Sequence, residues 1–454
     1  MRYGYILVSR IQSPPAVSGH GHVRLERTLL VVGVLALGYN LRGAITSLPP
    51  VFPELQSSLR LSSATISILA ATPVICFGVV SGFAAGLARR AGEERVLLGA
   101  SIALVIGLVA RGAAPGVLLF PGTILCSGAL AIMNVLLSSL IKRRWPERAG
   151  LLIGLYITAL SAGAIVASLV SVPLWQDTGG SVALTLGWLA APAALAVLLW
   201  LPQARSGARS WARARPGPRA GATLPDHTAP ARPARVAVHR HSLTWHVTIF
   251  MGMQSLLYYA TLSWLPTMLR DRGESAAAAG DLLALMGVGN LAVSMFIPMA
   301  AQRMRSQVVL VVPTVIAVAG GLAGLLYLPL GGAVAWALIL GAGQNAALAL
   351  AIFFTAARAP HAAAAASLSS LAQAVGYLLA SAGPLEVGLL HSATGSWTAP
   401  VMVLFALSGV MLVAGLLAAR PRMLPTVPEK EASDNEALEK NGLEEQATET
   451  GGTA

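Results

Sequence analysis

The sequence predicts an all-α integral membrane protein with twelve transmembrane helices in two six-helix pseudo-repeats. Three observations support this prediction. The chain of 454 residues is 55% hydrophobic and only 11% charged, with a mean hydropathy of +0.69, and a water-soluble surface of this size does not accommodate such a composition. Apolar runs of about 20 residues, the length that spans the hydrocarbon of a bilayer, recur along the chain. The basic residues collect in alternate loops between these runs.

Twelve apolar runs have the length and composition of transmembrane helices. They are apolar on all sides and too long for the strands of an outer-membrane barrel, which alternate over about 10 residues. An α-helix satisfies its own backbone hydrogen bonds in lipid, so each run is predicted to be a helix. The predicted spans are residues 28–48, 64–88, 96–114, 116–141, 149–173, 182–201, 245–268, 277–301, 308–330, 332–356, 367–390 and 397–419.

The net charge of +12 rests on 31 Lys and Arg residues that alternate by loop. One side of the predicted topology receives 26 of them, and the other side receives four, which are Arg60, Arg111, Arg270 and Arg272. By the positive-inside rule the rich side is the cytoplasm. We therefore expect a multi-pass protein of the plasma (inner) membrane with both termini in the cytoplasm. Arg111, at the end of the span 96–114, is counted with the loop that follows, so Arg42 is the one basic residue that we assign to the interior of a span.

The chain divides into two halves around a segment of different composition. Residues 202–244 hold eight Arg and six Pro without sustained apolar periodicity, which predicts a cytoplasmic linker. An N-terminal six-helix bundle, 28–201, and a C-terminal one, 245–419, are predicted on either side. Residues 1–27 are predicted to be a cytoplasmic tail. Residues 420–454 are predicted to be a disordered acidic tail, because eight acids and two Lys lie between Glu429 and Glu449.

Matching landmarks indicate that the second half repeats the first. Thr178 and Thr394, each followed by Gly, come after the fifth and eleventh spans and are 216 residues apart. Lys142 and Arg358 end the fourth and tenth spans at the same offset. A duplicated six-helix unit leaves this pattern. Two parallel six-helix repeats around a central site are an architecture of secondary transporters.

Two ionisable residues at membrane depth are candidates for function. An Arg within a span costs about 2.5–3.5 kcal/mol on insertion scales, so Arg42 must find a partner. That partner is either a small anion held by its planar fork or a structural group of the protein. Glu386, an acid inside the eleventh span, is expected at a similar depth. If the two residues pair, a proton on Glu386 releases Arg42 and couples protons to transport.

Polar and aromatic residues in the first and fourth spans of each half are predicted to line a substrate cavity. Amides in lipid seek partners, and equivalent helices of the two repeats carry them. Contacts between helices, or anchoring at the membrane interface, are the alternative interpretations. The candidate substrate-binding residues are Tyr39, Asn40, Arg42, Asn134, Gln254, Tyr258, Tyr259, Trp264, Gln344 and Asn345. The candidate gating residues in loops are Arg89, Arg90, Lys142, Arg143 and Arg303.

Several segments carry a resemblance to a known family. The segment Asn40-Leu41-Arg42-Gly43-Ala44-Ile45-Thr46-Ser47 resembles the first-span signature of the cyanate and 2-nitroimidazole transporter family of the major facilitator superfamily. Segments 141–148, 154–156, 254–266, 341–344 and 373–385 are similar to further motifs of that family. The resemblance covers residues 28–419 and implies the major facilitator fold, alternating access and a small, often anionic substrate.

The chain also departs from that family's pattern. Gly43 and Ser138 stand where the family has Pro, and Glu386 stands where it has an aliphatic residue. The loop 88–92 and its counterpart near Arg303 hold no Asp, which leaves the superfamily's acidic latch without its usual residue.

The predicted function is secondary active transport of a small solute, either a small anion such as cyanate or a small heterocycle, driven by an ion gradient with protons as the candidate ion. The sequence contains no GxxxxGK[ST] loop and no HExxH motif, and we find no paired nucleophile and base at membrane depth. We therefore expect no enzyme, no metal site and no cofactor. A multidrug or metabolite efflux carrier, and a transporter-like sensor that moves no solute, are the alternatives. The expected partners are the lipid bilayer and the substrate, with no nucleic acid, and the chain is predicted to be a monomer.

Overall fold

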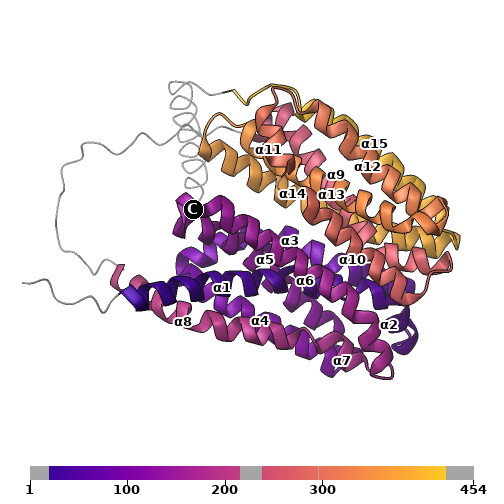
Figure 1. Cartoon of the computed structure of the whole chain (residues 1–454), viewed down its shortest axis with the longest axis horizontal. Helices are drawn as coiled ribbons and strands as arrows, with labels where there is room; N and C mark the ends of the chain where they lie inside the picture. The colour runs from indigo at the N-terminus through magenta and orange to yellow at the C-terminus, as the bar shows by residue number, and fades with distance from the viewer. Residues whose placement is uncertain (1–19, 215–237, 295, 426–454) are drawn as a thin grey trace, which may run out of the picture.

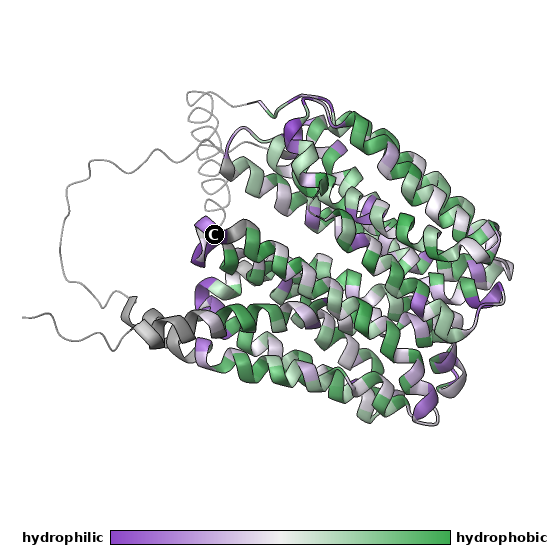
Figure 2. Cartoon of the chain, in the orientation of Figure 1, coloured by the Kyte–Doolittle hydropathy of each residue, from purple (hydrophilic) through white to green (hydrophobic). Residues whose placement is uncertain are grey.

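The computed structural model describes residues 20–214, 238–294 and 296–425, and within these ranges it is built of helices without strands. Two helical bundles lie side by side, the N-terminal half in indigo to magenta and the C-terminal half in pink through orange to yellow (Figure 1). Hydrophobic residues cover the length of the helices, and hydrophilic residues gather at the two ends of the bundles (Figure 2). Phe83 and Val117 are 69% and 79% exposed. Such an apolar exterior requires lipid around it, so the chain is a multi-pass membrane protein.

The N-terminal half begins within the predicted tail, at His20. Short 3₁₀ segments join some of its helices. The elements are α1 (His20–Thr46), η1 (Pro49–Val51), α2 (Phe52–Ser58), α3 (Ser63–Ala91), α4 (Glu93–Ala113), α5 (Pro115–Arg144), η2 (Pro146–Arg148), α6 (Ala149–Asp177), α7 (Val182–Gly187) and α8 (Ala190–Ala214).

The C-terminal half repeats the pattern of long helices. Its elements are η3 (Val238–Arg240), α9 (Ser242–Asp271), α10 (Ala276–Val293), α11 (Phe296–Arg303), α12 (Val308–Tyr327), η4 (Leu330–Gly332), α13 (Ala333–Ala357), α14 (Ala362–Thr394) and α15 (Thr398–Ala418).

The predicted spans coincide with these helices, and eleven in the described residues are both long enough and apolar enough to cross a membrane. The predicted span 245–268 is the exception, because its helix α9 is not among those eleven. α9 has 30 residues, about 45 Å at 1.5 Å per residue, so its length suffices. Its Gln, Ser, Thr and Tyr residues make α9 more polar than those eleven segments, and most of α9 is buried against neighbouring helices. Protein, rather than lipid, therefore surrounds this helix.

Several boundaries differ from the predicted ones. The span 182–201 is divided into α7 and α8 at Trp188 and Leu189, and the span 277–301 into α10 and α11. Helix α8 continues to Ala214, well inside the segment 202–244 that we predict to be a linker. The predicted tails and linker otherwise fall mainly on residues 1–19, 215–237 and 426–454, which lie outside the described residues.

Arg111 corrects the charge assignment, because it lies inside a span and not in a loop. Its side chain is 1% exposed within the N-terminal half. The Arg111 Nε donates to the carbonyl of Leu186 at 3.1 Å, and Nη1 donates to that of Ala44 at 3.3 Å. These carbonyls belong to the last turns of α7 and α1, where backbone acceptors lack partners within the helix. Arg111 therefore caps two helix ends.

Small residues bring the helices close together. A Cβ atom on Gly163 of α6 would lie 1.8 Å from the backbone oxygen of Tyr39, so α1 and α6 touch backbone to backbone. Between the halves, α3 packs against α14 and α6 packs against α10. These two pairs of helices form the walls on either side of the space in which the candidate site lies.

Candidate functional site

Arg42, near the end of α1, is half-buried where the two halves meet. Its guanidinium carbon lies 4.8 Å from the centre of the Tyr258 ring on α9, a cation–π contact between the halves. Within the described residues, the guanidinium makes no ion pair with a carboxylate and no hydrogen bond with a protein acceptor. A guanidinium carries five N–H donors. Those donors are available to an occupant of the adjoining space.

Three neighbouring cavities adjoin Arg42, with volumes of about 50, 30 and 10 Å³. Tyr258 also lines all three, so its side chain stands where they meet. Cavities of this size hold a few water molecules at most, so the site is contracted in this conformation. No Asp or Glu is among the residues that line the three cavities. The local charge is therefore positive.

The first cavity lies between both halves. Its amide, Asn134, accepts a hydrogen bond from the Tyr156 hydroxyl at 3.5 Å. Its aromatic wall includes Tyr377 of α14, whose ring centre is 5.8 Å from that of Phe77 on α3. The lining residues are Leu41, Arg42, Ile45, Thr46, Phe77, Asn134, Leu160, Tyr258, Tyr259, Leu262 and Tyr377.

The second cavity is rich in amides from the C-terminal half. The amide donor of Gln254 is satisfied locally, because its Nε2 donates to the carbonyl of Met251 at 3.0 Å and to the Ser255 hydroxyl at 2.5 Å. Asn290, Gln344 and Asn345 make no hydrogen bond through their amides to other described residues. The lining residues are Arg42, Gln254, Ser255, Tyr258, Tyr259, Asn290, Gln344, Asn345, Leu348 and Tyr377.

Seven of the ten candidate substrate-binding residues thus line these cavities. They are Arg42, Asn134, Gln254, Tyr258, Tyr259, Gln344 and Asn345. Two lining residues were not among the candidates from the sequence: Tyr377, which lines two cavities, and Asn290, which lines the second and third. An Asn within the apolar span 277–301 was the signal that would have identified Asn290.

The other three candidates lie elsewhere, and two of them, Asn40 and Trp264, make contacts between helices. Asn40 donates through Nδ2 to the carbonyls of Ala36, at 2.8 Å, and Pro192, at 3.3 Å, so it faces α8. The indole of Trp264 donates to the carbonyl of Pro384 at 2.8 Å. Tyr39 is half-buried and lines none of the three cavities.

Glu386 does not pair with Arg42, so the hypothesis of a direct ion pair is wrong for this conformation. The ion pairs among the described residues do not include it, and it lines none of the three cavities. It is half-buried on α14, the helix that also carries Tyr377. A role of Glu386 in proton coupling stays a prediction.

The halves are joined by an ion pair at the end of the bundle that holds Glu54, called the Glu54 end below. The Nη1 atom of Arg270, on α9, lies 2.7 Å from Oε1 and 2.9 Å from Oε2 of Glu54, on α2. Beside this pair, the Phe52 and Trp264 rings are 6.2 Å apart between centres. Polar and aromatic contacts between the halves therefore close the Glu54 end.

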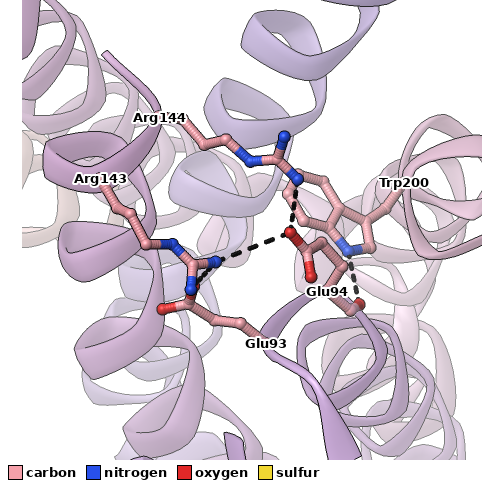
Figure 3. A network of polar contacts seen from close by, with 5 residues as sticks. All are labelled: Glu93, Glu94, Arg143, Arg144 and Trp200. Atoms are coloured by element: carbon pink, nitrogen blue, oxygen red, sulfur yellow. Dashed lines mark hydrogen bonds and ion pairs between the residues drawn. The ribbon is translucent and has the colours of Figure 1, made fainter. Parts of the chain in front are cut away.

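The opposite end, called the Arg143 end, holds an ionic network within the N-terminal half (Figure 3). Arg143 pairs with Glu93, and Arg144 pairs with Glu94 at 2.7 Å. The Trp200 indole donates to the backbone carbonyl of Glu94 at 3.0 Å, which adds α8 to α4 and α5. The loop 88–92 contains no acid, and the first two residues of α4, Glu93 and Glu94, provide the carboxylates for these ion pairs.

Of the candidate gating residues, Arg143 takes part in this network. Arg89, Arg90 and Arg303 are exposed at the ends of α3 and α11, without a role that the structure identifies, and the side chain of Lys142 lies outside the described part of the chain. The described residues also contain no group of three His, Cys, Asp or Glu side chains arranged to hold a metal ion.

Comparison with known proteins places the chain among transporters. A family model described as Major Facilitator Superfamily matches residues 29–384. The uncharacterized transporter YycB of Bacillus subtilis (strain 168) is 36% identical over 88% of this chain and 96% of its own length. The 2-nitroimidazole transporter of Escherichia coli (strain K12) is 35% identical over 87% and 97%, and the cyanate transport protein CynX of the same strain is 27% identical over 81% and 91%.

Solved structures support the same fold. A D-xylose–proton symporter superposes with a TM-score of 0.65, covering 90% of this chain and 99% of its own, at 16% sequence identity. At that identity the likeness concerns the fold alone. The predictions of two six-helix repeats, and of a transporter rather than an enzyme, are confirmed by the family match and these relatives.

Proposed function

Because this chain belongs to the Major Facilitator Superfamily, we propose that it is a secondary transporter that carries a small planar anion, or a heterocycle with an anion-like group, by alternating access. The observation that carries the proposal is the state of Arg42. Its guanidinium adjoins three cavities, no carboxylate lines them, and no protein acceptor among the described residues takes its donors.

An anion is the occupant that best complements this arginine. A guanidinium within a membrane costs about 2.5–3.5 kcal/mol on insertion scales, and the Tyr258 ring offsets part of that cost through a cation–π contact of about 0.5–2 kcal/mol. The remainder of that cost is left for a bound substrate to offset. A carboxylate, nitro group or similar planar group binds the fork through two parallel hydrogen bonds.

The named substrates of two relatives agree with this chemistry. One relative is named for 2-nitroimidazole, a planar heterocycle whose nitro oxygens accept hydrogen bonds, and the other for cyanate, a small anion. Both compounds present acceptor atoms to a donor such as Arg42. They support a small acceptor-bearing substrate for this chain without selecting between the two.

We propose an orientation in the inner membrane with both termini in the cytoplasm. The imbalance of basic residues between the two sides supports it, although Arg111 now counts as a buried residue. In this orientation the Glu54 end faces outward and the Arg143 end faces the cytoplasm. The closed Glu54 end then corresponds to a conformation in which the site is shut off from the outside.

An ion gradient is the proposed energy source, with Glu386 as the candidate proton acceptor. Its position on α14 supports this role, because that helix contributes Tyr377 to the cavities and packs against α3 and α9. Protonation of a half-buried acid on this helix alters the charge next to the moving interface between the halves.

The test is uptake into proteoliposomes. Labelled cyanate and labelled benzoate are offered under an imposed proton gradient to the native chain, Arg42→Ala, Glu386→Gln and the control Arg305→Ala, which removes an exposed arginine from a loop. Uptake is expected to fall to the level of empty liposomes in Arg42→Ala and to persist in the control. Loss of gradient dependence in Glu386→Gln supports proton coupling. Uptake that survives in Arg42→Ala contradicts the proposal.

A further inference from the structure

Gln344 on α13 is a buried amide without a partner. Its side chain lines the second cavity and is 3% exposed. Both Nε2 and Oε1 lack a hydrogen bond, although protein atoms cover them. A buried polar group without a partner costs about 1–3 kcal/mol. The fold therefore keeps both a donor and an acceptor unsatisfied at one edge of the site.

The neighbouring amides show that this edge differs from ordinary helix contacts. Gln254 faces the same cavity, yet Met251 and Ser255 satisfy its donor. Asn290 and Asn345 also line this cavity, and their side-chain amides form no hydrogen bond with other described residues. Three amides with free donors and acceptors converge on one cavity. An occupant with only acceptors would leave the amide oxygens unpaired.

The same cavity is bounded by Arg42 and by three tyrosines, so a single occupant can contact both the guanidinium of Arg42 and the amide of Gln344. The Tyr258 and Tyr259 rings meet edge to face with their centres 5.1 Å apart, and Tyr377 completes the aromatic wall. Aromatic walls favour a flat, unsaturated body. Tyr258 also borders the other two cavities, so movement of its ring enlarges the space beside Arg42.

We propose that the substrate is a planar heterocyclic carboxylate with a lactam edge, that is, a ring N–H beside a ring carbonyl. Its carboxylate binds Arg42, its ring lies against the tyrosines, and its N–H and C=O pair with Oε1 and Nε2 of Gln344. This inference rests on the proposed function and adds the chemistry of the second edge. It also makes Gln344 a residue that determines specificity.

Three ligands distinguish the contribution of the carboxylate to binding from that of the lactam edge. Orotate, a uracil ring with a carboxylate, has both; benzoate has the carboxylate alone; and uracil has the lactam alone. A site that is built to bond a substrate N–H discriminates strongly against an analogue that lacks it, because its own polar groups then stay unpaired. Orotate is therefore expected to bind at least about tenfold more tightly than either of the other two ligands.

The experiment measures the dissociation constants of these ligands by titration calorimetry with the full chain in nanodiscs. Gln344→Leu is expected to weaken orotate binding about tenfold and benzoate binding less than about threefold. Gln373→Leu is the matched control, because Gln373 is bonded to Ser369 on α14 and lines none of the three cavities. It is expected to retain the preference for orotate.

Other outcomes overturn the inference in distinguishable ways. If benzoate binding depends on Arg42 but orotate binds no better, or if Gln344→Leu weakens both ligands equally, the lactam edge is wrong and the anion carrier stands. If neither carboxylate binds the native chain but cyanate uptake still depends on Arg42, the inference fails and the anion carrier stands. If the native chain neither binds a carboxylate nor takes up cyanate, or if Arg42→Ala does both as well as the native chain, the proposed function fails together with the inference.

Discussion

The ion pair between Glu54 and Arg270 is predicted to hold the Glu54 end closed. The two Nη1–oxygen distances of 2.7 and 2.9 Å place the pair within hydrogen-bonding range, and the side chains are only 15% and 25% exposed. After allowance for partial screening by solvent, a charged contact of this kind contributes about 1.5–3 kcal/mol. Removing it should shift the equilibrium between closed and open forms by about 10- to 150-fold.

Arg270→Gln is the perturbation, since it removes the charge and keeps a side chain of comparable length. Spin labels on Ser58→Cys and Glu274→Cys, one in each half near the pair, report the opening of this end by double electron–electron resonance. The buried native thiols, Cys76 and Cys126, are first replaced by Ala. The variant is expected to show a longer distance that the parent chain populates weakly.

The control is a charge swap that combines Glu54→Arg with Arg270→Glu, which should restore the shorter distance. Distance distributions that are identical in Arg270→Gln and the parent would show that the aromatic and apolar contacts close this end without the ion pair. That result would refute the energetic reasoning.

Two further predictions follow from packing and charge. Gly163→Ala should lower the unfolding temperature by several degrees, because the new Cβ falls 1.8 Å from the Tyr39 backbone oxygen. The control, Gly154→Ala on the same helix, meets nothing within 4 Å and should be neutral or stabilise the protein by about 0.5–1 kcal/mol. The unfolding temperatures of both variants are measured with a thiol-reactive dye that detects Cys76 and Cys126 on heating. Since Glu386 is proposed to take up a proton with each monovalent anion, uptake should carry no net charge, and inside-positive and inside-negative potassium diffusion potentials should give equal rates. Faster uptake under an inside-positive potential would show that the anion moves without a proton and would contradict the proposed coupling.

The architecture could be predicted from the sequence because each helix must satisfy its own backbone in lipid, which makes an apolar run of fixed length a strong signal. The rotation of each helix is harder to predict. Lipid-facing and protein-facing side chains are both apolar, so hydropathy does not identify the inner face. Asn40 illustrates this limit: it lies two residues from Arg42, about 200° around an α-helix, and the two side chains face different neighbours.

The contacts between distant segments lay beyond the sequence analysis. Glu93 and Glu94 were visible as acids beside a loop, but their pairing with Arg143 and Arg144 depends on how α4 and α5 pack. Arg111 looked like a loop residue because it is close to the end of its helix, yet it turns inward toward the carbonyls of two neighbours.

The enclosure of α9 has a consequence for how the protein is made. This helix follows the Arg-rich segment and is too polar to count as a span by composition, and in the folded protein its neighbours bury most of it. The insertion machinery sorts segments by their own hydrophobicity as they emerge. Stable integration of α9 therefore depends on helices that are synthesised after it, α14 above all, so ribosomes must complete nearly the whole chain before its seventh crossing is secure.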